Sequence, residues 1–165
     1  MKVALLMGSD SDLPRLEPCL ALLRELGIAS EARVLSAHRT PAAVVRFVEE
    51  ARGRGIGVLI CAAGGAAHLA GVVSAHTDLP VLGIPIDNPP LGGLDSLLST
   101  VQMPGGVPVG TLGVGVGGPV NAAILAARIL ALGDPELAQR VARYRTAQSE
   151  KVLAKDRALQ SKLAP

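Results

Sequence analysis

Residues 56–63 read IGVLICAA, and the fold prediction starts from this stretch. It is an unbroken apolar run of strand length that lies between a helical segment and a pair of glycines. A strand with one wet face alternates apolar and polar residues, whereas a continuous apolar run indicates a strand buried on both faces. Such strands occur in sheets that helices cover on both sides, so the run predicts a parallel α/β sheet.

Apolar runs and helical stretches alternate on both sides of this segment. The expected helices each bring apolar side chains to one face, for example Val44 and Phe47 in the helix at 41–55. The other expected strands are 2–7, 29–36, 79–86 and 106–114, and the other expected helices are 13–27, 66–77, 94–101 and 119–133. Strands that alternate with helices predict one domain, a three-layer α/β/α sandwich with a flavodoxin-like parallel sheet. Functional sites in such folds lie at the carboxyl ends of the strands.

The last stretch, residues 134–165, differs from the core at 1–133. It is helical in propensity and strongly charged, and only a narrow stripe of Leu137, Val141 and Tyr144 is apolar. A helix this polar either frays or lies across a neighbouring subunit. The preceding helix carries almost no charge, so we expect it to be buried, in part at an interface. Together they predict a homo-oligomer with a long C-terminal helix that reaches a neighbouring subunit.

Composition and charge narrow the possible functions. The net charge is only +2 and aromatic residues make up 1% of the chain, which argues against nucleic-acid partners. No apolar run is long enough to cross a bilayer, and residues 2–7 read as a strand rather than as part of a signal peptide. Cys19 and Cys61 are isolated in apolar stretches, which indicates buried free thiols in a reducing compartment. We therefore expect a cytoplasmic protein without a membrane partner.

The loop after the first expected strand is MGSDSD (7–12). Its Ser9, Ser11 and Asp12 offer hydroxyls and a carboxylate near a helix N-terminus, where free backbone N–H groups favour an anion. The hydroxyls would bind phosphate and Asp12 would bind sugar hydroxyls. The competing interpretation is that Ser11 or Asp12 merely caps the helix.

The loop after the second expected strand is SAHRTP (36–41). The planar guanidinium of Arg39 suits a phosphate, and the imidazole of His38 suits a general acid and base because it titrates near neutral pH. The competing interpretation is a loop histidine bonded to backbone and an arginine in solvent. In either case Thr40 and Pro41 start the next helix.

Two further loops follow the third and fourth strands. The third loop is AAGGAAHLAG (62–71), where Gly64 and Gly65 let the backbone approach a ligand closely. His68 falls in the first turn of the next helix, whose dipole disfavours a protonated imidazole, or it is a core histidine bonded to backbone. The fourth segment, LDSLLSTVQMPGGVPVG (94–110), is rich in hydroxyls and glycines but identifies no chemistry by itself.

The glycine pattern GVGVGG (113–118) resembles a dinucleotide-binding fingerprint. That fingerprint needs a further strand after the helix, with an acidic residue for the ribose, and here the chain stays helical instead. A flavin site is disfavoured because almost no aromatic residue is present to flank the ring. No His/Cys/Asp cluster has the spacing of metal ligands, so we expect no metal site.

The loops together resemble the N5-carboxyaminoimidazole ribonucleotide mutase family of purine biosynthesis. MGSDSD, SAHRTP, AGGAAHLAG and DSLLSTVQMPGGVPVGTL carry the resemblance, which spans roughly residues 2–150 in order and at the family's spacing. It implies a three-layer α/β fold and an octamer whose C-terminal helix reaches over a neighbour. It also implies a nucleotide substrate whose N-carboxylate leaves as carbon dioxide and is captured by carbon 4 of the imidazole, without metal, ATP, biotin or another cofactor.

The resemblance also assigns roles to residues. His38 would move the proton, as donor in the first half of the reaction and acceptor in the second. The segment with Gly64, Gly65 and His68 would close over the base and carboxylate, and the remaining positions would hold the phosphate and ribose: Ser9, Ser11, Asp12, Ser36 and Arg39. The chain departs from the family wording at Ala70, where proline is usual, and in DNPPLGG (87–93).

Two other functions stay open at this point. A second branch of the family carboxylates aminoimidazole ribonucleotide directly with carbon dioxide, although the wording of the SAHRTP and GGAAHL segments follows the mutase branch. A non-catalytic domain that binds a nucleotide phosphate on the same scaffold would bind ligand without turnover, and its binding would not depend on the His38 imidazole.

Overall fold

A five-stranded parallel sheet forms the centre of the structure, a computed structural model that describes residues 1–163. Its strands are β1 (Lys2–Met7), β2 (Ser30–Val34), β3 (Ile56–Gly64), β4 (Val81–Ile86) and β5 (Gly110–Thr111). Their spatial order is β2-β1-β3-β4-β5, and every neighbouring pair is parallel. β3 pairs with β1 on one side and β4 on the other, and residues 56–62 are buried, as their unbroken apolar run predicts.

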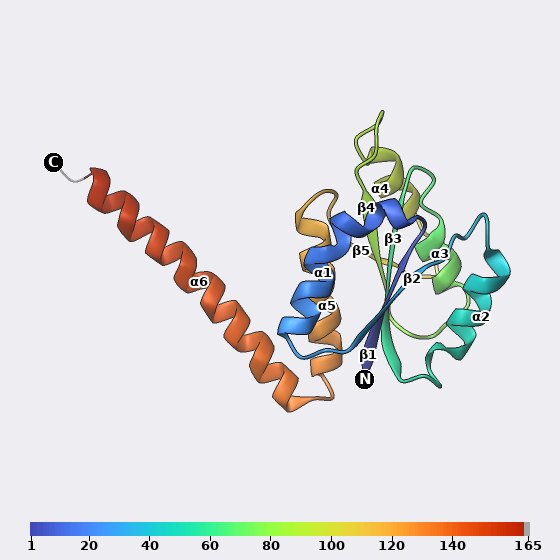
Figure 1. The fold of residues 1–165 in the computed structure, drawn as a ribbon, viewed down its shortest axis with the longest axis horizontal. Coiled ribbons are helices and arrows are strands. Elements are labelled where there is room, and N and C mark those ends of the chain that lie inside the picture. Colours follow the sequence, from blue (N-terminus) through green and yellow to red (C-terminus); the bar gives the residue numbers. More distant parts are fainter. Residues whose placement is uncertain (164–165) are drawn as a thin grey trace.

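Helices cover both faces of this sheet, which confirms the three-layer α/β/α prediction (Figure 1). A short 3-10 turn, η1 (Asp10–Asp12), leads into α1 (Leu13–Glu25), which packs with α5 (Gly117–Ala131) on one face. The opposite face carries α2 (Pro41–Ala51), α3 (Leu69–Ser74) and α4 (Leu94–Val101). The apolar stripe expected in α2 is buried at Val44, Phe47, Val48 and Ala51.

Several elements are shorter than their sequence patterns indicate, and β5 and α3 differ most from the expected ranges. β5 contains only Gly110 and Thr111, because Pro108 has no N–H with which to extend the ladder to β4. α3 begins at Leu69, so His68 is the residue before the helix rather than part of its first turn. The difference matters for the site, because His68 is placed by the loop from β3 and not by helical geometry.

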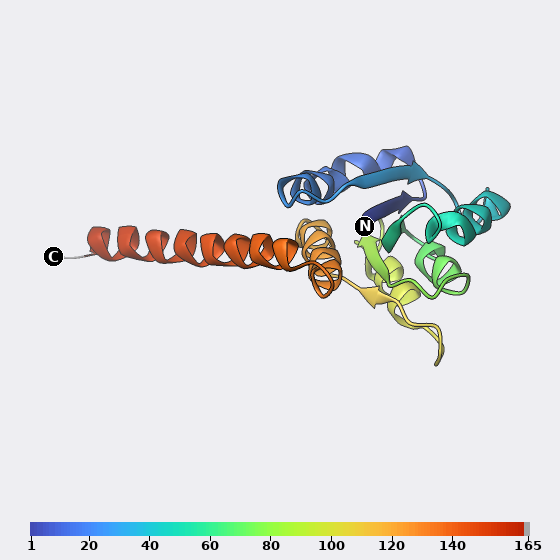
Figure 2. The same ribbon diagram turned by 90° about the horizontal axis from the view of Figure 1, so that it is seen from below.

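The C-terminal helix α6 (Pro135–Leu163) packs on the domain only at its start and then projects away from it (Figures 1 and 2). Leu137 is buried, and Val141 and Tyr144 pack against the same core, which confirms the expected stripe. Every residue from 145 to 163 is exposed. That this part of the helix reaches a neighbouring subunit stays a prediction.

Gly118, the last glycine of GVGVGG, serves packing. A Cβ on Gly118 would overlap the carbonyl oxygen of Gly113, so the first turn of α5 can lie against the preceding loop only if residue 118 is glycine. Within residues 1–163 no strand follows α5, because the chain passes directly into α6. The structure therefore contradicts the dinucleotide-binding alternative, which needs that strand.

Both cysteines are buried free thiols, as predicted. Burial raises the pKa of the Cys19 thiol to about 12 and raises the pKa of Cys61 as well, so both are protonated at neutral pH. Within the part of the chain that the structure describes, no helix combines the length and the apolar character that crossing a membrane requires.

A cluster of charged side chains lies at the β2 edge of the sheet. The carboxylate of Glu31 accepts hydrogen bonds from Arg54, Lys2 and Arg33, and the Arg54 guanidinium lies 4.7 Å from the centre of the Phe47 ring. The hydrogen bond from Arg54 is the main reason that the pKa of Glu31 is lowered, with the charges of Arg54 and Lys2 acting in the same direction.

We expect Glu31→Gln to lower the free energy of unfolding at neutral pH by about 0.5–1 kcal/mol, the usual contribution of a partly exposed ion pair. Because the folded-state pKa is depressed, the contribution of Glu31 is present above the ordinary glutamate pKa and is lost as the pH falls through the folded-state value. Urea unfolding of the wild type and the variant at a series of pH values should show a difference in the free energy of unfolding that disappears in acid. Glu49→Gln, an exposed control, should show no difference, and a difference for Glu31→Gln that stays constant in acid would contradict the account.

Candidate active site

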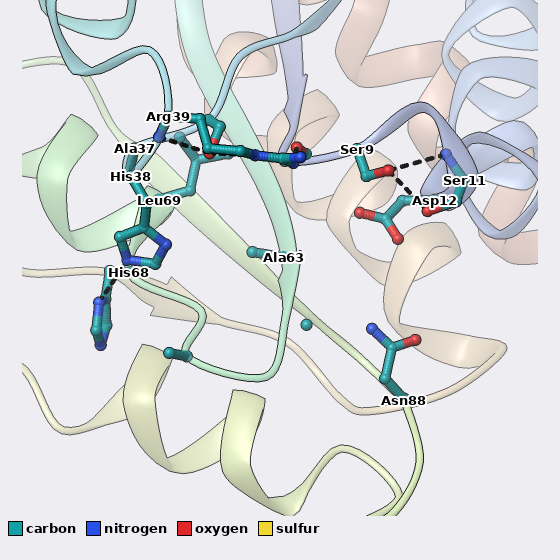
Figure 3. A pocket seen from close by; sticks show the side chains of 14 residues that line it. Ser9, Ser11, Asp12, Ala37, His38, Arg39, Ala63, His68, Leu69 and Asn88 are labelled. Atoms are coloured by element: carbon teal, nitrogen blue, oxygen red, sulfur yellow. Dashed lines mark hydrogen bonds between the residues drawn. The ribbon is translucent and has the colours of Figure 1, made fainter.

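The polar loops meet at the carboxyl ends of β1 to β4 (Figure 3). The strand order turns back between β1 and β3, and open α/β sheets form their ligand crevice at such a point. A pocket of about 210 Å³ lies there. It is lined by most of the residues expected from the sequence: Ser9, Ser11, Asp12, Ser36, His38, Arg39, Gly64 and His68.

The loop after β1 is held by Ser9, not by the residues expected to cap the helix. The Ser9 hydroxyl accepts hydrogen bonds from the Ser11 N–H (3.3 Å) and the Ser11 hydroxyl (2.8 Å). Asp12 makes no capping hydrogen bond, so the capping interpretation of Ser11 and Asp12 is wrong. Its carboxylate turns into the pocket instead (Figure 3).

Burial has an electrostatic effect on Asp12, which is only 6% exposed. Loss of solvent raises the pKa of its carboxyl group, and this effect outweighs the nearby charge of Arg15 and the backbone hydrogen bond at Ser9, which act in the opposite direction. A carboxylate that has lost part of its hydration gains from any ligand hydroxyl that donates a hydrogen bond to it.

Arg39 is fixed against the loop after β1. One terminal nitrogen of its guanidinium donates to the carbonyl of Gly8 at 2.7 Å, and its Nε and backbone N–H lie 3.5 and 3.2 Å from the Ser36 hydroxyl. Thr40 closes the turn by accepting from the Ser36 N–H and donating to the Ser36 carbonyl. Arg39 is exposed but is not the freely solvated side chain of the competing interpretation, and its remaining N–H groups are available to an anion.

His38 and His68 form a pair at one side of the pocket (Figure 3). Nε2 of His38 lies 2.8 Å from Nδ1 of His68, and the rings are almost perpendicular at 89°. At this distance one nitrogen donates and the other accepts, so the pair carries at most one positive charge while the contact persists. His38 is thus bonded to a side chain rather than to backbone, and His68 is exposed rather than part of the core, which corrects both alternative interpretations.

The loop after β3 is held by α4. Ser99 accepts a hydrogen bond from the Ala67 N–H at 3.0 Å, and its hydroxyl lies 3.3 Å from the Gly65 carbonyl. The hydroxyl-rich segment that identified no chemistry therefore supports the loop that carries His68. Gly65 has a positive φ of 63°, which favours glycine, and it does not line the pocket, whereas Gly64 does.

Asn88 lines the pocket but was not among the expected site residues. It follows β4 in the DNPPLGG segment, and its carboxamide faces the site from below Asp12 in the view of Figure 3. Its position after a strand that ends at the same sheet edge was the available signal. The described part of the chain contains no group of three or more His, Cys, Asp or Glu side chains that could hold a metal ion.

We expect Asp12→Asn to unfold with a free energy roughly 1 kcal/mol higher than the wild type at neutral pH, because a neutral amide avoids the desolvation that raises the Asp12 pKa. Because the pKa of Asp12 is raised in the folded state, the cost of burying its charged form is present above that pKa and disappears as the pH falls toward the ordinary aspartate value. The difference in the free energy of unfolding between the two proteins should therefore disappear in acid. Urea unfolding as a function of pH measures it. Asp156→Asn on α6 is the exposed control, and a less stable Asp12→Asn protein would contradict the account.

Comparison with known proteins agrees with this geometry. The family model described as AIR carboxylase matches residues 2–151. The N5-carboxyaminoimidazole ribonucleotide mutase of Brucella melitensis is 52% identical over 150 residues, which cover 91% of this chain and 93% of that protein. The protein of the same name from Thermotoga maritima is 48% identical over 159 residues, which cover 96% of this chain and 92% of the relative.

Solved structures show the same relationship. PurE from Treponema denticola superimposes with a TM-score of 0.86 at 32% identity and covers 99% of this chain and 98% of that chain. A 3-dehydroquinate dehydratase-like protein from Bifidobacterium longum, at 18% identity and a TM-score of 0.53, shares the fold alone. The family model spans most of the chain and the relatives are about half identical over nearly their whole length, and on these grounds the chain belongs to the AIR carboxylase family.

Proposed function

We propose that this protein converts N5-carboxyaminoimidazole ribonucleotide to 4-carboxyaminoimidazole ribonucleotide in purine biosynthesis. The observation that carries the proposal is the grouping of an exposed imidazole, a fixed guanidinium and a desolvated carboxylate in one pocket: His38, Arg39 and Asp12. The substrate carries a phosphate, ribose hydroxyls and a carboxylated base, and each of these groups has a chemically matched partner in that set.

The charges of the pocket orient the substrate. Arg39, with the hydroxyls of Ser9, Ser11 and Ser36 around it, binds the phosphate, because a guanidinium forms charge-assisted hydrogen bonds to phosphate oxygens. Asp12 accepts hydrogen bonds from ribose hydroxyls. The base then lies toward the His38–His68 pair, and the loop with Gly64 and His68 closes over it.

His38 carries one proton through both halves of the reaction. In the first half the imidazolium protonates the carboxylated nitrogen, the N–C bond breaks, and its electron pair returns to the nitrogen as carbon dioxide leaves. In the second half carbon 4 of aminoimidazole ribonucleotide attacks carbon dioxide, and His38 removes the hydrogen of that carbon so that the ring regains its aromatic electrons. The proton returns to His38, so the cycle needs no external acid or base and no cofactor.

Released carbon dioxide has to stay beside the ring until carbon 4 attacks it. Ala37, Ala63 and Leu69 line the pocket next to the histidines, and apolar walls hold a neutral gas without offering it water. The contact between His38 and His68 supports the same step, because it fixes the direction of the His38 ring while one nitrogen of the pair stays unprotonated.

Direct carboxylation of aminoimidazole ribonucleotide is the second candidate, since the family model is described by that reaction. The names of the relatives at about half identity, all given as mutases, favour the first. A non-catalytic nucleotide-binding domain is disfavoured by the exposed imidazole pair, which phosphate binding alone does not require.

We also propose that the protein works as a homo-oligomer in the cytoplasm, an octamer as the family resemblance implies. Val152, Leu159 and Leu163 are exposed on the projecting part of α6. At 3.6 residues per turn they lie on the helix face that packs on the protein's own core at Leu137 and Val141. A helix face that is buried at the start of α6 and carries apolar side chains again in its solvent-exposed part supports a second copy of the chain as the partner of that exposed part.

Turnover tests the reaction. Purified protein should form 4-carboxyaminoimidazole ribonucleotide from N5-carboxyaminoimidazole ribonucleotide without ATP or added bicarbonate and with metal chelated, as followed by ultraviolet absorbance. His38→Asn should retain substrate binding within about threefold and lose at least about a thousandfold in kcat, since it keeps a polar side chain but cannot carry the proton. Formation of product only from aminoimidazole ribonucleotide and carbon dioxide would assign the direct carboxylase, and full activity of His38→Asn would refute its role.

Sedimentation velocity tests the assembly. The double variant Val152→Glu with Leu159→Glu should sediment as a smaller species than the wild type, because burying two carboxylates in an apolar interface is unfavourable. Ala154→Glu with Ser161→Glu adds the same charge to the opposite face of α6 and should sediment like the wild type. If the first variant retains the wild-type assembly, α6 is not the contact.

A further inference from the structure

We infer that Asn88 is a further substrate-binding residue, which binds the ribose hydroxyls together with Asp12. This inference deepens the proposed function and rests on its nucleotide substrate. Neither the loop motifs nor the comparisons assign a role to Asn88, which lies in the segment where the chain departs from the family wording.

The backbone places Asn88 firmly. Its N–H donates to the carbonyl of Ile86 at 3.1 Å, and its own carbonyl accepts from the Gly92 N–H at 3.0 Å, which fixes the turn that follows β4. In the sheet register Ile86 lies beside Gly64 at the end of β3. Although Asn88 belongs to a loop, its position is thus fixed by the end of β4.

The side chain of Asn88 lies directly on Gly64. A Cβ on residue 64 would overlap Nδ2 of Asn88, so glycine at this position makes room for the carboxamide. The expected reason for Gly64 was a close approach of backbone to a ligand, and the structure gives this second reason. The contact turns the amide toward the pocket, which both residues line (Figure 3).

The carboxamide still has hydrogen bonds to make. Within residues 1–163 it forms none to another residue, although it is partly buried and has two N–H donors and one acceptor. Partly exposed amides take their hydrogen-bond partners from solvent or from a ligand. A bound ligand would supply them here, because the amide faces the pocket and not the protein interior.

The charge of Asp12 indicates which group of the substrate Asn88 binds. The Asp12 carboxylate lies at the same end of the pocket, and it repels both the phosphate and the carboxylate of the substrate. The positive charge of Arg39 offsets this repulsion for a phosphate on its side of the pocket, and the histidine pair lies at the opposite end of the site (Figure 3). The end shared by Asp12 and Asn88 therefore suits a neutral group that both donates and accepts, and the vicinal hydroxyls of ribose have this property.

An ion pair joins the start of α1, which follows Asp12, to the loop after β4. Arg15, three residues after Asp12, places its Nε 3.1 Å from the carboxylate of Asp87, the neighbour of Asn88. Both side chains are nearly half exposed, so the pair adds little to stability. The pair shows that the start of α1 and the loop after β4 are in contact, which places the Asp12 carboxylate and the Asn88 amide within reach of one ligand.

Isothermal titration calorimetry with simple sugar phosphates tests the inference without requiring turnover. The wild type should bind ribose 5-phosphate about five- to tenfold more tightly than at least one of 2-deoxyribose and 3-deoxyribose 5-phosphate, as expected for one or two hydrogen bonds. Asn88→Ala should bind ribose 5-phosphate about five- to tenfold more weakly, with little preference left among the three sugars. Its affinity for inorganic phosphate should be unchanged, because phosphate contacts the Arg39 end.

Two further variants control the experiment. Asn121→Ala removes the chain's other asparagine, which is exposed on α5 outside this pocket, and it should bind all ligands like the wild type. Asn88→Ser retains a donor and an acceptor in a smaller side chain; it should fall between wild type and Asn88→Ala, and it replaces Asn88→Ala if that protein does not fold by circular dichroism. Equal affinity of wild type and Asn88→Ala for ribose 5-phosphate, an equal loss for inorganic phosphate, or no binding of ribose 5-phosphate to the wild type would each overturn the inference.

Turnover separates this inference from the proposed function. If the protein turns over N5-carboxyaminoimidazole ribonucleotide, Asn88→Ala should raise KM about five- to tenfold and leave kcat within about twofold, because Asn88 touches the sugar and not the reacting atoms. An unchanged KM in an active enzyme would overturn the role of Asn88 and leave the reaction intact. Absence of turnover, with the sugar-phosphate pattern as expected, would overturn the reaction and leave a ribose phosphate site at Asn88.

Discussion

Burial of β3 on both faces is the constraint from which the rest of the structure follows. A strand without a polar face has to be covered by helices on both sides, so each connection between parallel strands crosses over the sheet as a helix. Each crossover returns the chain to the amino end of the sheet, so that every strand runs in the same direction. The loops after β1 to β4 therefore meet at the carboxyl edge of the sheet. The residues that bear the chemistry are far apart in sequence and are brought together by this packing alone.

Each charged group of the site is held by a neighbour that determines its properties. The Gly8 carbonyl fixes the Arg39 guanidinium, burial raises the pKa of Asp12, and the 2.8 Å contact limits the His38–His68 pair to one positive charge. Asp12 illustrates the balance between stability and function, since the desolvation that disfavours its charge in the folded protein also makes it a strong acceptor for a ligand hydroxyl.

Much of the fold and most of the residues that line the pocket could be predicted from the sequence, because periodicity and turn residues are local signals. The strands, the buried face of α2 and the stripe of α6 follow from such patterns. Three features do not, because they depend on tertiary contacts: the pairing of His38 with His68, the support of the 64–68 loop by Ser99, and the contact of Asn88 with Gly64. The local prediction that Ser11 or Asp12 caps α1 failed because the short turn η1 precedes α1, and Ser9 is the residue whose side chain caps that turn.

The central claim is that the carboxylate leaves nitrogen and reaches carbon 4 inside one pocket. N5-carboxyaminoimidazole ribonucleotide labelled with ¹³C in its carboxylate, incubated with the protein in unlabelled bicarbonate, tests this claim directly by ¹³C NMR of the product. The account predicts that most of the label is found in the carboxylate of 4-carboxyaminoimidazole ribonucleotide, because the pocket holds carbon dioxide until it reacts. Product that carries carbon from the unlabelled bicarbonate instead would show that carbon dioxide escapes and is taken up from solution, which would contradict it.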